Sequence, residues 1–528
     1  MQTPEFPLEI PRSQNRNIQY TTTLGNIRKN PGMIKQYYLI SILSFLLISC
    51  KKEQKSENII SSNFSELNIE KFTETELEFD FNLLVNSLKE AHTGLYWYNT
   101  EKQFDSIVKL QKSKIKDSLN GLEFYNIVAP IVSYTKEGHS YIRTSKDVSK
   151  YLNKNGKFIP LIVLSENEKI YILNNPNDKI KIKGLELKKI NGKKIEDIYK
   201  KLFSTITSDG FIKQSKYRNL DNFHLSTYYA KSIGIFNNYN IEVYDKKLNK
   251  YQNLIIKSAD INRLSKIVND VALYSDFEPI DFSIINKNTA IFTINTFQND
   301  DYEEKNLNFK KNVSKTFKKI DSLQIKNLII DIRENSGGTE GNEDYLFSFL
   351  TDKPYNKYKN VEISAFKYSF YKHTDYNKPE DIKEFETDIK KEHYLTKNGK
   401  ILRKKGIEEI EPLKPKPFKG NIYILTSGWT YSGGAEFSSL MKQHTNAIFI
   451  GEEVGGGFHG NTSGYGLEMT LPNTEIKVNI PVLKFSLDVD KGIFGRGVIP
   501  DYKIQSTFED YENKIDRVME FTKKLITK

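Results

Sequence analysis

Hydrophobic residues recur at helical spacing in the first third of the chain. Phe81, Leu84 and Leu88 lie three and four positions apart, which places them on one face of a helix. The same spacing returns between residues 104 and 110 and between 124 and 132. The pattern predicts three helices within 76–137, and we expect a small helical domain over residues 76–150.

After this helical region, apolar and polar residues alternate in short runs, which is typical of strands with one buried face. Asn191-Gly192 within it is a tight-turn signal. The strand, the turn and the short helix after them resemble part of a PDZ domain, although a hairpin in another kind of β domain fits nearly as well. The pattern predicts a PDZ-like β domain over residues 151–260, in which 217–235 is ambiguous. The alternating runs are 158–164, 169–173, 185–190, 239–243 and 253–256.

Strands and helices alternate in the second half of the chain. This order predicts a layered α/β core over residues 265–528. The polar stretch 352–417, rich in Lys and Glu, is expected to be a long insertion with some helix. The predicted strands are 289–296, 327–332, 421–425, 447–450, 467–471 and 476–483, and the predicted helices are 306–323 and 345–350.

The stretch 421–440 is the first candidate for chemistry. It contains an apolar strand, a polar turn and a helix that begins near Gly433. Ser432 stands at the hinge, where the free N–H groups of the first helical turn can stabilise an oxyanion. An ordinary connection between a strand and a helix has the same pattern, so the motif alone leaves both interpretations open.

Composition limits the possible classes of protein. The 528 residues suggest two to four domains, and a hydrophobic content of 38% is enough for substantial cores. The net charge of +11 comes from scattered basic residues, so we do not expect nucleic-acid binding. The single cysteine, Cys50, excludes an intrachain disulfide and a cysteine-based metal site.

The N-terminal region has the pattern of an export signal. An apolar run over 37–49 follows the sequence MIK that starts at Met33, and it ends in the sequence LISC at 47–50. LISC resembles a bacterial lipobox, in which cleavage precedes a lipid-modified cysteine; a buried helix with a core cysteine is the alternative. We therefore expect a leader over 1–50 with the true start at Met33, lipidation at Cys50, and a polar tether over 51–75. The protein would be exported and anchored in the cell envelope, on the outer membrane or the periplasmic side.

Several further motifs accompany Ser432 in a fixed order. They are EGHS (137–140), DIRENSGG (331–338), TSGWTYSGGAEF (426–437), IGEEVGGG (450–457) and GRGVIPD (495–501). The set resembles the S41 family of serine peptidases, which includes the C-terminal processing and tricorn-like peptidases. The resemblance spans residues 76–505, and it implies a crotonase/ClpP-like α/β peptidase core.

The resemblance also implies roles for individual residues. One branch of the family uses a lysine as general base, but Gly457 stands in its place here. The tricorn-like branch uses a histidine, matched by His139, whose ordinary pKa suits proton transfer near neutral pH. Ser432 would then be the nucleophile, and amides of Gly433 and of the loop with Gly337 and Gly338 would form the oxyanion hole.

Two points in this assignment stay open. Tricorn-like members carry a glutamate shortly before the final GVxPD, whereas residues 492–496 contain no carboxylate. Asp488 or Asp490 is the candidate that would orient His139. His459 is a rival base, while Arg333 and Asp331 are expected to be structural, and the five remaining histidines, such as His92, to be incidental.

The leading hypothesis is a serine endopeptidase that acts on peptides or proteins without a cofactor or a metal. Its PDZ-like domain would collect extended or C-terminal segments. A catalytically inactive lipoprotein that binds peptides or ligands is the alternative, and acyl-CoA chemistry of the crotonase kind is a third. The sequence leaves the oligomeric state and the substrate preference open.

Overall fold

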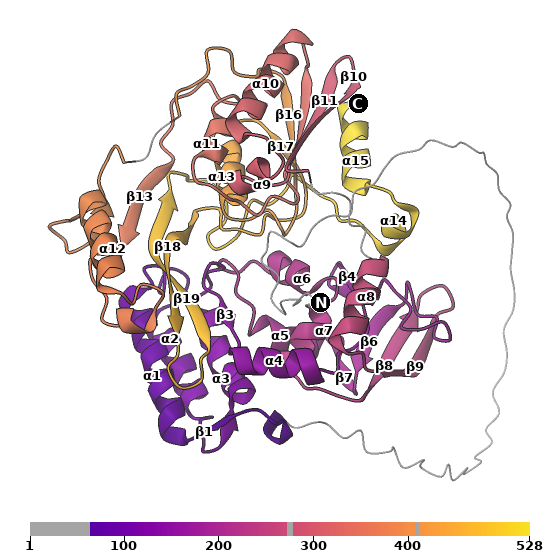
Figure 1. Cartoon of the computed structure of the whole chain (residues 1–528). Helices are drawn as coiled ribbons and strands as arrows, with labels where there is room; N and C mark the ends of the chain where they lie inside the picture. Colours follow the sequence, from indigo (N-terminus) through magenta and orange to yellow (C-terminus); the bar gives the residue numbers. More distant parts are fainter. Residues whose placement is uncertain (1–63, 272–277, 408–410, 528) are drawn as a thin grey trace, which may run out of the picture.

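The computed structural model describes residues 64–271, 278–407 and 411–527 (Figure 1). The predicted leader, with Met33 and Cys50, lies outside these residues. No helix in the described ranges is both long and apolar enough to cross a membrane.

The N-terminal region contains the three predicted helices: α1 (Glu74–Ala91), α2 (Glu101–Lys112) and α3 (Gly121–Tyr134). Each begins with a reciprocal capping box, in which the side chains of Thr73, Thr100 and Asn120 accept from the first turn. Helix α1 buries Leu77, Phe81, Leu84 and Leu88 at the spacing read from the sequence. The shorter elements are η2 (Phe64–Glu66), β1 (Lys71–Phe72), β2 (Leu119–Asn120), β3 (Ile142–Arg143) and α4 (Lys146–Asn155).

An antiparallel sheet follows, with strand order β4-β5-β6-β8-β9 and β7 paired to β6. Asn191 and Gly192 both have positive φ, 49° and 77°, as expected for the predicted tight turn between β6 and β7. The ambiguous segment 217–235 is largely helical. The elements are β4 (Val163–Glu166), β5 (Lys169–Ile172), β6 (Glu186–Ile190), β7 (Lys193–Lys194), α5 (Ile195–Phe203), α6 (Gln214–Leu220), α7 (His224–Ser232), β8 (Asn238–Asp245), β9 (Lys250–Lys257) and α8 (Ile261–Val271).

The second half forms a six-stranded sheet of order β10-β11-β12-β16-β17-β20, parallel from β11 onward. Strands β12 and β16 are almost fully buried because helices cover both faces. Leu328, Ile330 and Ile424 pack toward α10, α11 and α13, whereas Ile329 and Leu425 pack toward α15. The elements are β10 (Ile280–Asn286), β11 (Thr289–Ile294), α9 (Asn299–Glu303), α10 (Phe309–Ser322), β12 (Asn327–Asp331), α11 (Asn342–Phe347), β16 (Asn421–Thr426), α13 (Gly433–His444), β17 (Ile448–Gly451), β20 (Tyr502–Lys503), α14 (Phe508–Asn513) and α15 (Arg517–Ile526).

The stretch 352–417, expected to be a long insertion with some helix, contains helix as expected but also strands of a second sheet. Its strand order is β14-β15-β13-β19-β18, with β3 paired to β19. Strand β13 buries only Val361 and Ile363, so its sequence is polar enough to be mistaken for an insertion. The elements are β13 (Tyr358–Ile363), η3 (Tyr371–His373), α12 (Pro379–Glu392), β14 (His393–Leu395), β15 (Ile401–Arg403), β18 (Gly460–Thr470) and β19 (Lys477–Leu487).

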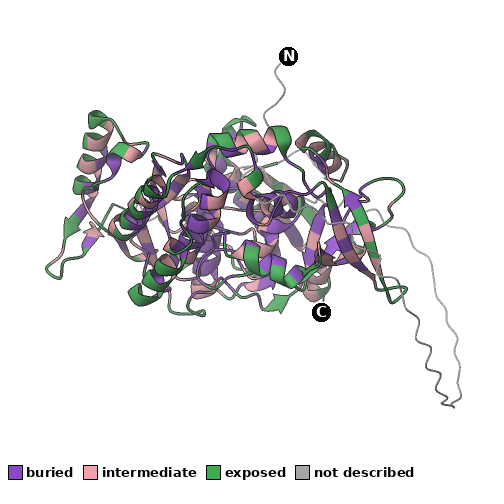
Figure 2. Cartoon of the chain, turned by 90° about the horizontal axis from the view of Figure 1, so that it is seen from below, coloured by how far each residue is buried: buried purple, intermediate pink, exposed green. Residues whose placement is uncertain are grey.

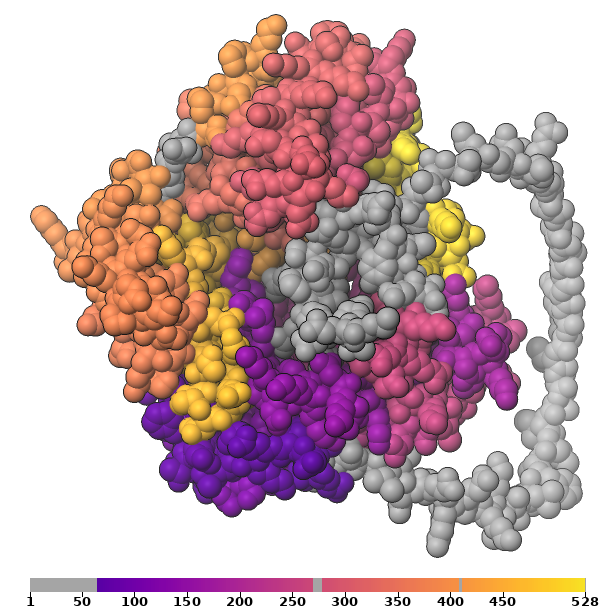
Figure 3. Space-filling view, in the orientation of Figure 1, coloured from indigo at the N-terminus to yellow at the C-terminus, as the bar shows by residue number. Residues whose placement is uncertain are grey.

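The β18–β19 hairpin joins the two halves of the chain. Its apolar residues share one hydrophobic core with α1 and α3, and Figure 3 shows the hairpin against the N-terminal helices. Buried residues fill the middle of the molecule between these layers (Figure 2). The fold is thus the expected α/β class, with an N-terminal helical part and a β domain, and this packing fixes where the end of the helical region lies.

Candidate active site

Ser432 lies on a sharp turn between β16 and α13. Strand β16 ends at Thr426 and α13 begins at Gly433. Ser432 has φ 49° and ψ −123°, a conformation that costs a non-glycine residue energy and persists only where its surroundings enforce it. The turn therefore holds one half-buried hydroxyl group in a fixed position at the N-terminus of a helix.

The loop after β12 holds this turn in place. Strands β12 and β16 pair in parallel, so the loops that follow them lie at the same edge of the sheet. Thr430 Oγ1 donates to the carbonyl of Ile332 at 2.9 Å, and the amide of Tyr431 donates to the carbonyl of Asn335 at 3.0 Å. This contact explains why the DIRENSGG motif accompanies the serine turn.

Arg333 and Asp331 act within the same loop. The Arg333 guanidinium bridges Asp331 at 2.6 Å and Asp516 at 2.7 Å. These contacts tie the loop to α15 and involve neither Ser432 nor His139, as expected for structural residues.

His139 reaches Ser432 from the N-terminal region. Its Nε2 lies 3.1 Å from Ser432 Oγ, across 293 positions of sequence. Strand β3, just after the histidine, pairs with β19, and Asn479 Nδ2 of β19 donates to the His139 carbonyl at 2.8 Å. The second sheet therefore delivers the histidine to the serine.

The residues beside His139 are held by buried groups. Glu137 accepts from the amide and the hydroxyl of Thr462 at 3.1 and 3.0 Å, and burial together with the charge of Asp209 raises its pKa well above the usual range. His92 Nε2 lies 2.8 Å from Ser140 Oγ, and burial lowers the pKa of His92 to about 4. His92, to which the sequence analysis gave no role, thus anchors the residue after His139.

A tyrosine and a carboxylate lie on the far side of the His139 ring. Tyr431 Oη is 3.2 Å from His139 Nδ1 and donates to Asp209 Oδ1 at 2.8 Å. The amides of Gly138 and Gly457 also donate to Asp209, at 2.7 and 2.9 Å. Asp209 lies in the loop after α5, and sequence reasoning missed it because Thr-Ser-Asp-Gly reads only as a turn.

Asp488 and Asp490 lie elsewhere, so the expectation that either orients His139 does not hold. Gln443 Nε2 donates to Asp490 Oδ1 at 2.8 Å, and Asn356 Nδ2 is 3.5 Å from Asp488 Oδ2. Both carboxylates act on the titration of His444, at the C-terminal end of α13 rather than at its start.

The rival histidine, His459, lies apart from Ser432. Among the described residues, the His459 ring makes no hydrogen bond to Ser432, and its Nδ1 has no partner. The ring packs against Phe458 and Phe494, and burial lowers the pKa of His459.

The glycine loop differs in one respect from the expected oxyanion hole. The Gly337 amide donates to Asn335 Oδ1 at 2.9 Å, so it is already engaged. Within the described ranges, the amides of Gly433 and Gly338 have no hydrogen-bond partner. Gly337 instead supplies space, because a Cβ there would lie 2.8 Å from the Gly433 nitrogen and 3.1 Å from Ser432 Oγ.

A buried lysine lies beside the first turn of α13. Lys357 contacts Glu343, Asp344 at 2.9 Å and Glu436 at 3.1 Å. Burial alone would lower the pKa of Lys357, but the three carboxylates raise it well above its usual value. This lysine remains protonated. It is therefore unsuited to act as general base in place of a lysine at position 457.

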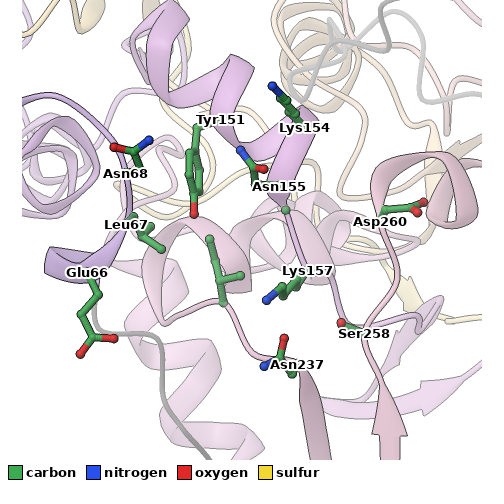
Figure 4. Close-up of a pocket in the computed structure, with 12 residues that line it drawn as sticks. Glu66, Leu67, Asn68, Tyr151, Lys154, Asn155, Lys157, Asn237, Ser258 and Asp260 are labelled. Atoms are coloured by element: carbon green, nitrogen blue, oxygen red, sulfur yellow. The ribbon is translucent and has the colours of Figure 1, made fainter.

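A cavity of about 700 Å³ lies between η2, α4 and the β domain (Figure 4). Tyr151, Lys157, Asn237 and Asp260 line it, together with eight other residues. Neither Ser432 nor His139 is among them, so this cavity is separate from the candidate site.

Comparisons with known proteins bear on the family and the fold. Residues 288–504 match the profile of peptidase family S41. The crystal structure of mature CPAF has a TM-score of 0.57 and 14% identity, covering 85% of this chain and 96% of that chain. Mature CPAF complexed with lactacystin has a TM-score of 0.57 and 15% identity, covering 85% and 97%.

The photosystem II D1 C-terminal processing protease has a TM-score of 0.37 and 10% identity, covering 82% of this chain and 93% of that chain. No curated protein sequence matches this chain significantly. At such low identities the two CPAF structures establish a shared fold, while the profile covers the strands and the turn that carry Ser432. Residues 288–504, which include Ser432, therefore match the serine-type peptidase family S41, and the chain shares the fold of mature CPAF.

Proposed function

We propose that this protein is an endopeptidase that cleaves peptide bonds through an acyl-enzyme on Ser432, with His139 as general base. The observation that carries the proposal is the 3.1 Å separation of Ser432 Oγ and His139 Nε2. This is hydrogen-bond reach for a proton transfer. The pair is also the nucleophile and base expected of the histidine-dependent branch of the family.

In the first half of the reaction, Ser432 attacks the substrate carbonyl carbon while its proton passes to His139 Nε2. The carbonyl oxygen becomes an oxyanion. The partner-less amides of Gly433 and Gly338 are the donors available to it, and the space beside Gly337 accommodates it.

In the second half, His139 returns the proton to the leaving amine, and the C–N bond breaks. Water then attacks the Ser432 ester with His139 again as base, which releases the acid and restores the serine. Each step uses the same pair of atoms, so both side chains are required for turnover.

The test is covalent labelling of the full chain by a fluorophosphonate, combined with cleavage of a denatured protein substrate. We expect labelling at Ser432 and cleavage in the wild type, and loss of both in Ser432→Ala and His139→Ala. His459→Ala is the matched control and should behave as the wild type. Cleavage that persists in Ser432→Ala would show that another group is the nucleophile.

An unlabelled wild type would instead favour the alternative, a binding lipoprotein that keeps the fold without the chemistry. The β domain with its antiparallel sheet is the part that we propose to hold extended peptide segments in either case. Peptide binding by the catalytically dead Ser432→Ala variant would separate capture from cleavage.

We further propose that the protein is exported and lipid-anchored at Cys50 in the cell envelope. The support is the sequence LISC at 47–50 and the apolar run before it. Incorporation of a radiolabelled fatty acid should disappear in Cys50→Ser. A mature N-terminus upstream of Met33 would contradict the proposal.

A further inference from the structure

The contacts around Tyr431 define the direction of its hydrogen bonds. A phenol has one proton to donate. Asp209 receives it at 2.8 Å, and the same carboxylate accepts amide protons from Gly138 and Gly457. With its proton directed to Asp209, Tyr431 Oη can only accept from the His139 Nδ1 that lies 3.2 Å away.

This direction selects one tautomer of the histidine. If Nδ1 carries the hydrogen, Nε2 keeps its lone pair and can accept the proton of Ser432, from which it lies 3.1 Å. The opposite tautomer would present an N–H to the serine and could not act as a base.

Resting on the proposed function, we infer that Asp209 and Tyr431 are positioning residues that hold His139 in its reactive tautomer and stabilise its protonated form. The serine proton moves only to Nε2. Tyr431 stays a neutral phenol and Asp209 stays a carboxylate, which polarises the phenol against the imidazolium. The β domain thereby supplies the carboxylate that residues 492–496 lack.

Two glycines beside Asp209, Gly138 and Gly457, leave room for the hydrogen bonds of its carboxylate. A Cβ on Gly138 would lie 2.2 Å from Tyr431 Oη and 3.1 Å from Asp209 Oδ1. Gly457 gives its amide to Asp209, and a Cβ there would meet the Gly460 carbonyl at 2.7 Å. Both positions therefore leave little room for a side chain around the carboxylate.

The experiment measures the rate of fluorophosphonate labelling of the full chain as a function of pH. In Tyr431→Phe we expect labelling to be about 10- to 100-fold slower near neutral pH, because a hydrogen bond to a charged ring is lost. The acid limb of the profile should move to lower pH, since the imidazolium loses its hydrogen bond to the phenol oxygen.

Asp209→Asn tests the carboxylate itself. Its amide group can donate to Tyr431, which reverses the phenol and favours the unreactive tautomer of His139. The loss in labelling rate could then approach the ~10⁴-fold loss in kcat that an Asp→Asn change causes in a Ser-His-Asp triad. Tyr141→Phe is the matched control, because Tyr141 also donates to a carboxylate, Glu468 at 3.3 Å, two positions from His139. It should leave both the rate and the acid limb unchanged.

The outcomes distinguish this inference from the proposed function. If the wild type is labelled at Ser432 and both variants keep its rate and its acid limb, the positioning role is wrong while the peptidase assignment stands. An unreactive wild type overturns both. If Asp209→Asn fails to fold, Tyr431→Phe still decides the matter, because partial unfolding lowers the labelled fraction without shifting the acid limb.

Discussion

The Gly138→Ala substitution offers the sharpest test of the arrangement behind His139. Gly138 is not among the residues with positive φ, so alanine can adopt its backbone conformation and only the added methyl group matters. That methyl would lie 2.2 Å from Tyr431 Oη and 2.8 Å from Tyr431 Cζ. Ordinary contact needs about 3.5 Å, so the phenol must move by roughly 1.3 Å.

A displacement of this size breaks the chain of hydrogen bonds. The phenol cannot keep both its 2.8 Å contact to Asp209 and its 3.2 Å contact to His139. A shift of about 1 Å in a catalytic arrangement costs on the order of 10²-fold in rate. Overpacking should lower the free energy of unfolding by about 1–3 kcal/mol, so the variant is expected to fold.

The assay is the rate of fluorophosphonate labelling, with thermal unfolding measured on the same preparation. Gly121→Ala is the control, because its methyl would lie 3.2 Å from Val148 Cγ2, far from the serine in sequence and fold. If the methyl acts through the phenol, adding Tyr431→Phe should slow Gly138→Ala little further. Labelling of Gly138→Ala at the wild-type rate, or fully additive losses in the double variant, would refute the reasoning.

Three more substitutions test other parts of the structure. Gly337→Ala should reduce labelling and cleavage by about 10²- to 10³-fold, because its methyl would occupy the space 3.1 Å from Ser432 Oγ; wild-type kinetics would exclude that space as the oxyanion position. Arg218→Met leaves Glu452 as an unpaired buried carboxylate, so the free energy of unfolding in urea should fall by about 3–5 kcal/mol, and an unchanged value would contradict this. The pKa of buried His92 is lowered to about 4, so only the unfolded chain binds this proton between pH 6.5 and 4. The free energy of unfolding should therefore fall by about 3 kcal/mol as the pH is lowered across that window. His92→Gln should remove that part of the pH dependence, and an identical pH profile in the variant would show that the histidine does not cause it.

Elements whose structure depends mainly on their own segment could be predicted from the sequence. The serine turn was readable because an apolar strand, two glycines and an amphipathic helix follow one another within 421–440. The helices around Phe81 were readable for the same reason, since their buried faces repeat at helical spacing. Strand β13 was missed because only Val361 and Ile363 are buried in it, which leaves too few apolar positions to indicate a strand.

The site residues that could not be predicted depend on contacts between segments far apart in the sequence. His139 could be matched to a role only through the family motif, because nothing local in EGHS indicates that β19 delivers it to Ser432. Nothing in the sequence indicated a role for Asp209. Asp488 and Asp490 were chosen because they lie close in sequence to residues 492–496, but they contact Asn356 and Gln443 instead. Sequence distance was a poor guide to which acid faces the histidine.

The position of Asp209 has a consequence for how such a site can vary. A carboxylate that orients a histidine must satisfy a distance and a hydrogen-bond direction, and neither requirement specifies the segment that supplies it. Here the loop after α5 meets both through Tyr431, which immediately precedes the nucleophile and is held by the same turn. Because the tyrosine spans the gap, the acid can come from the β domain, and the stretch before GVIPD is free to lose its carboxylate. In the mechanism that we propose, the serine turn thus carries two functions in adjacent residues: one side chain attacks the substrate, and the other links the base to its carboxylate.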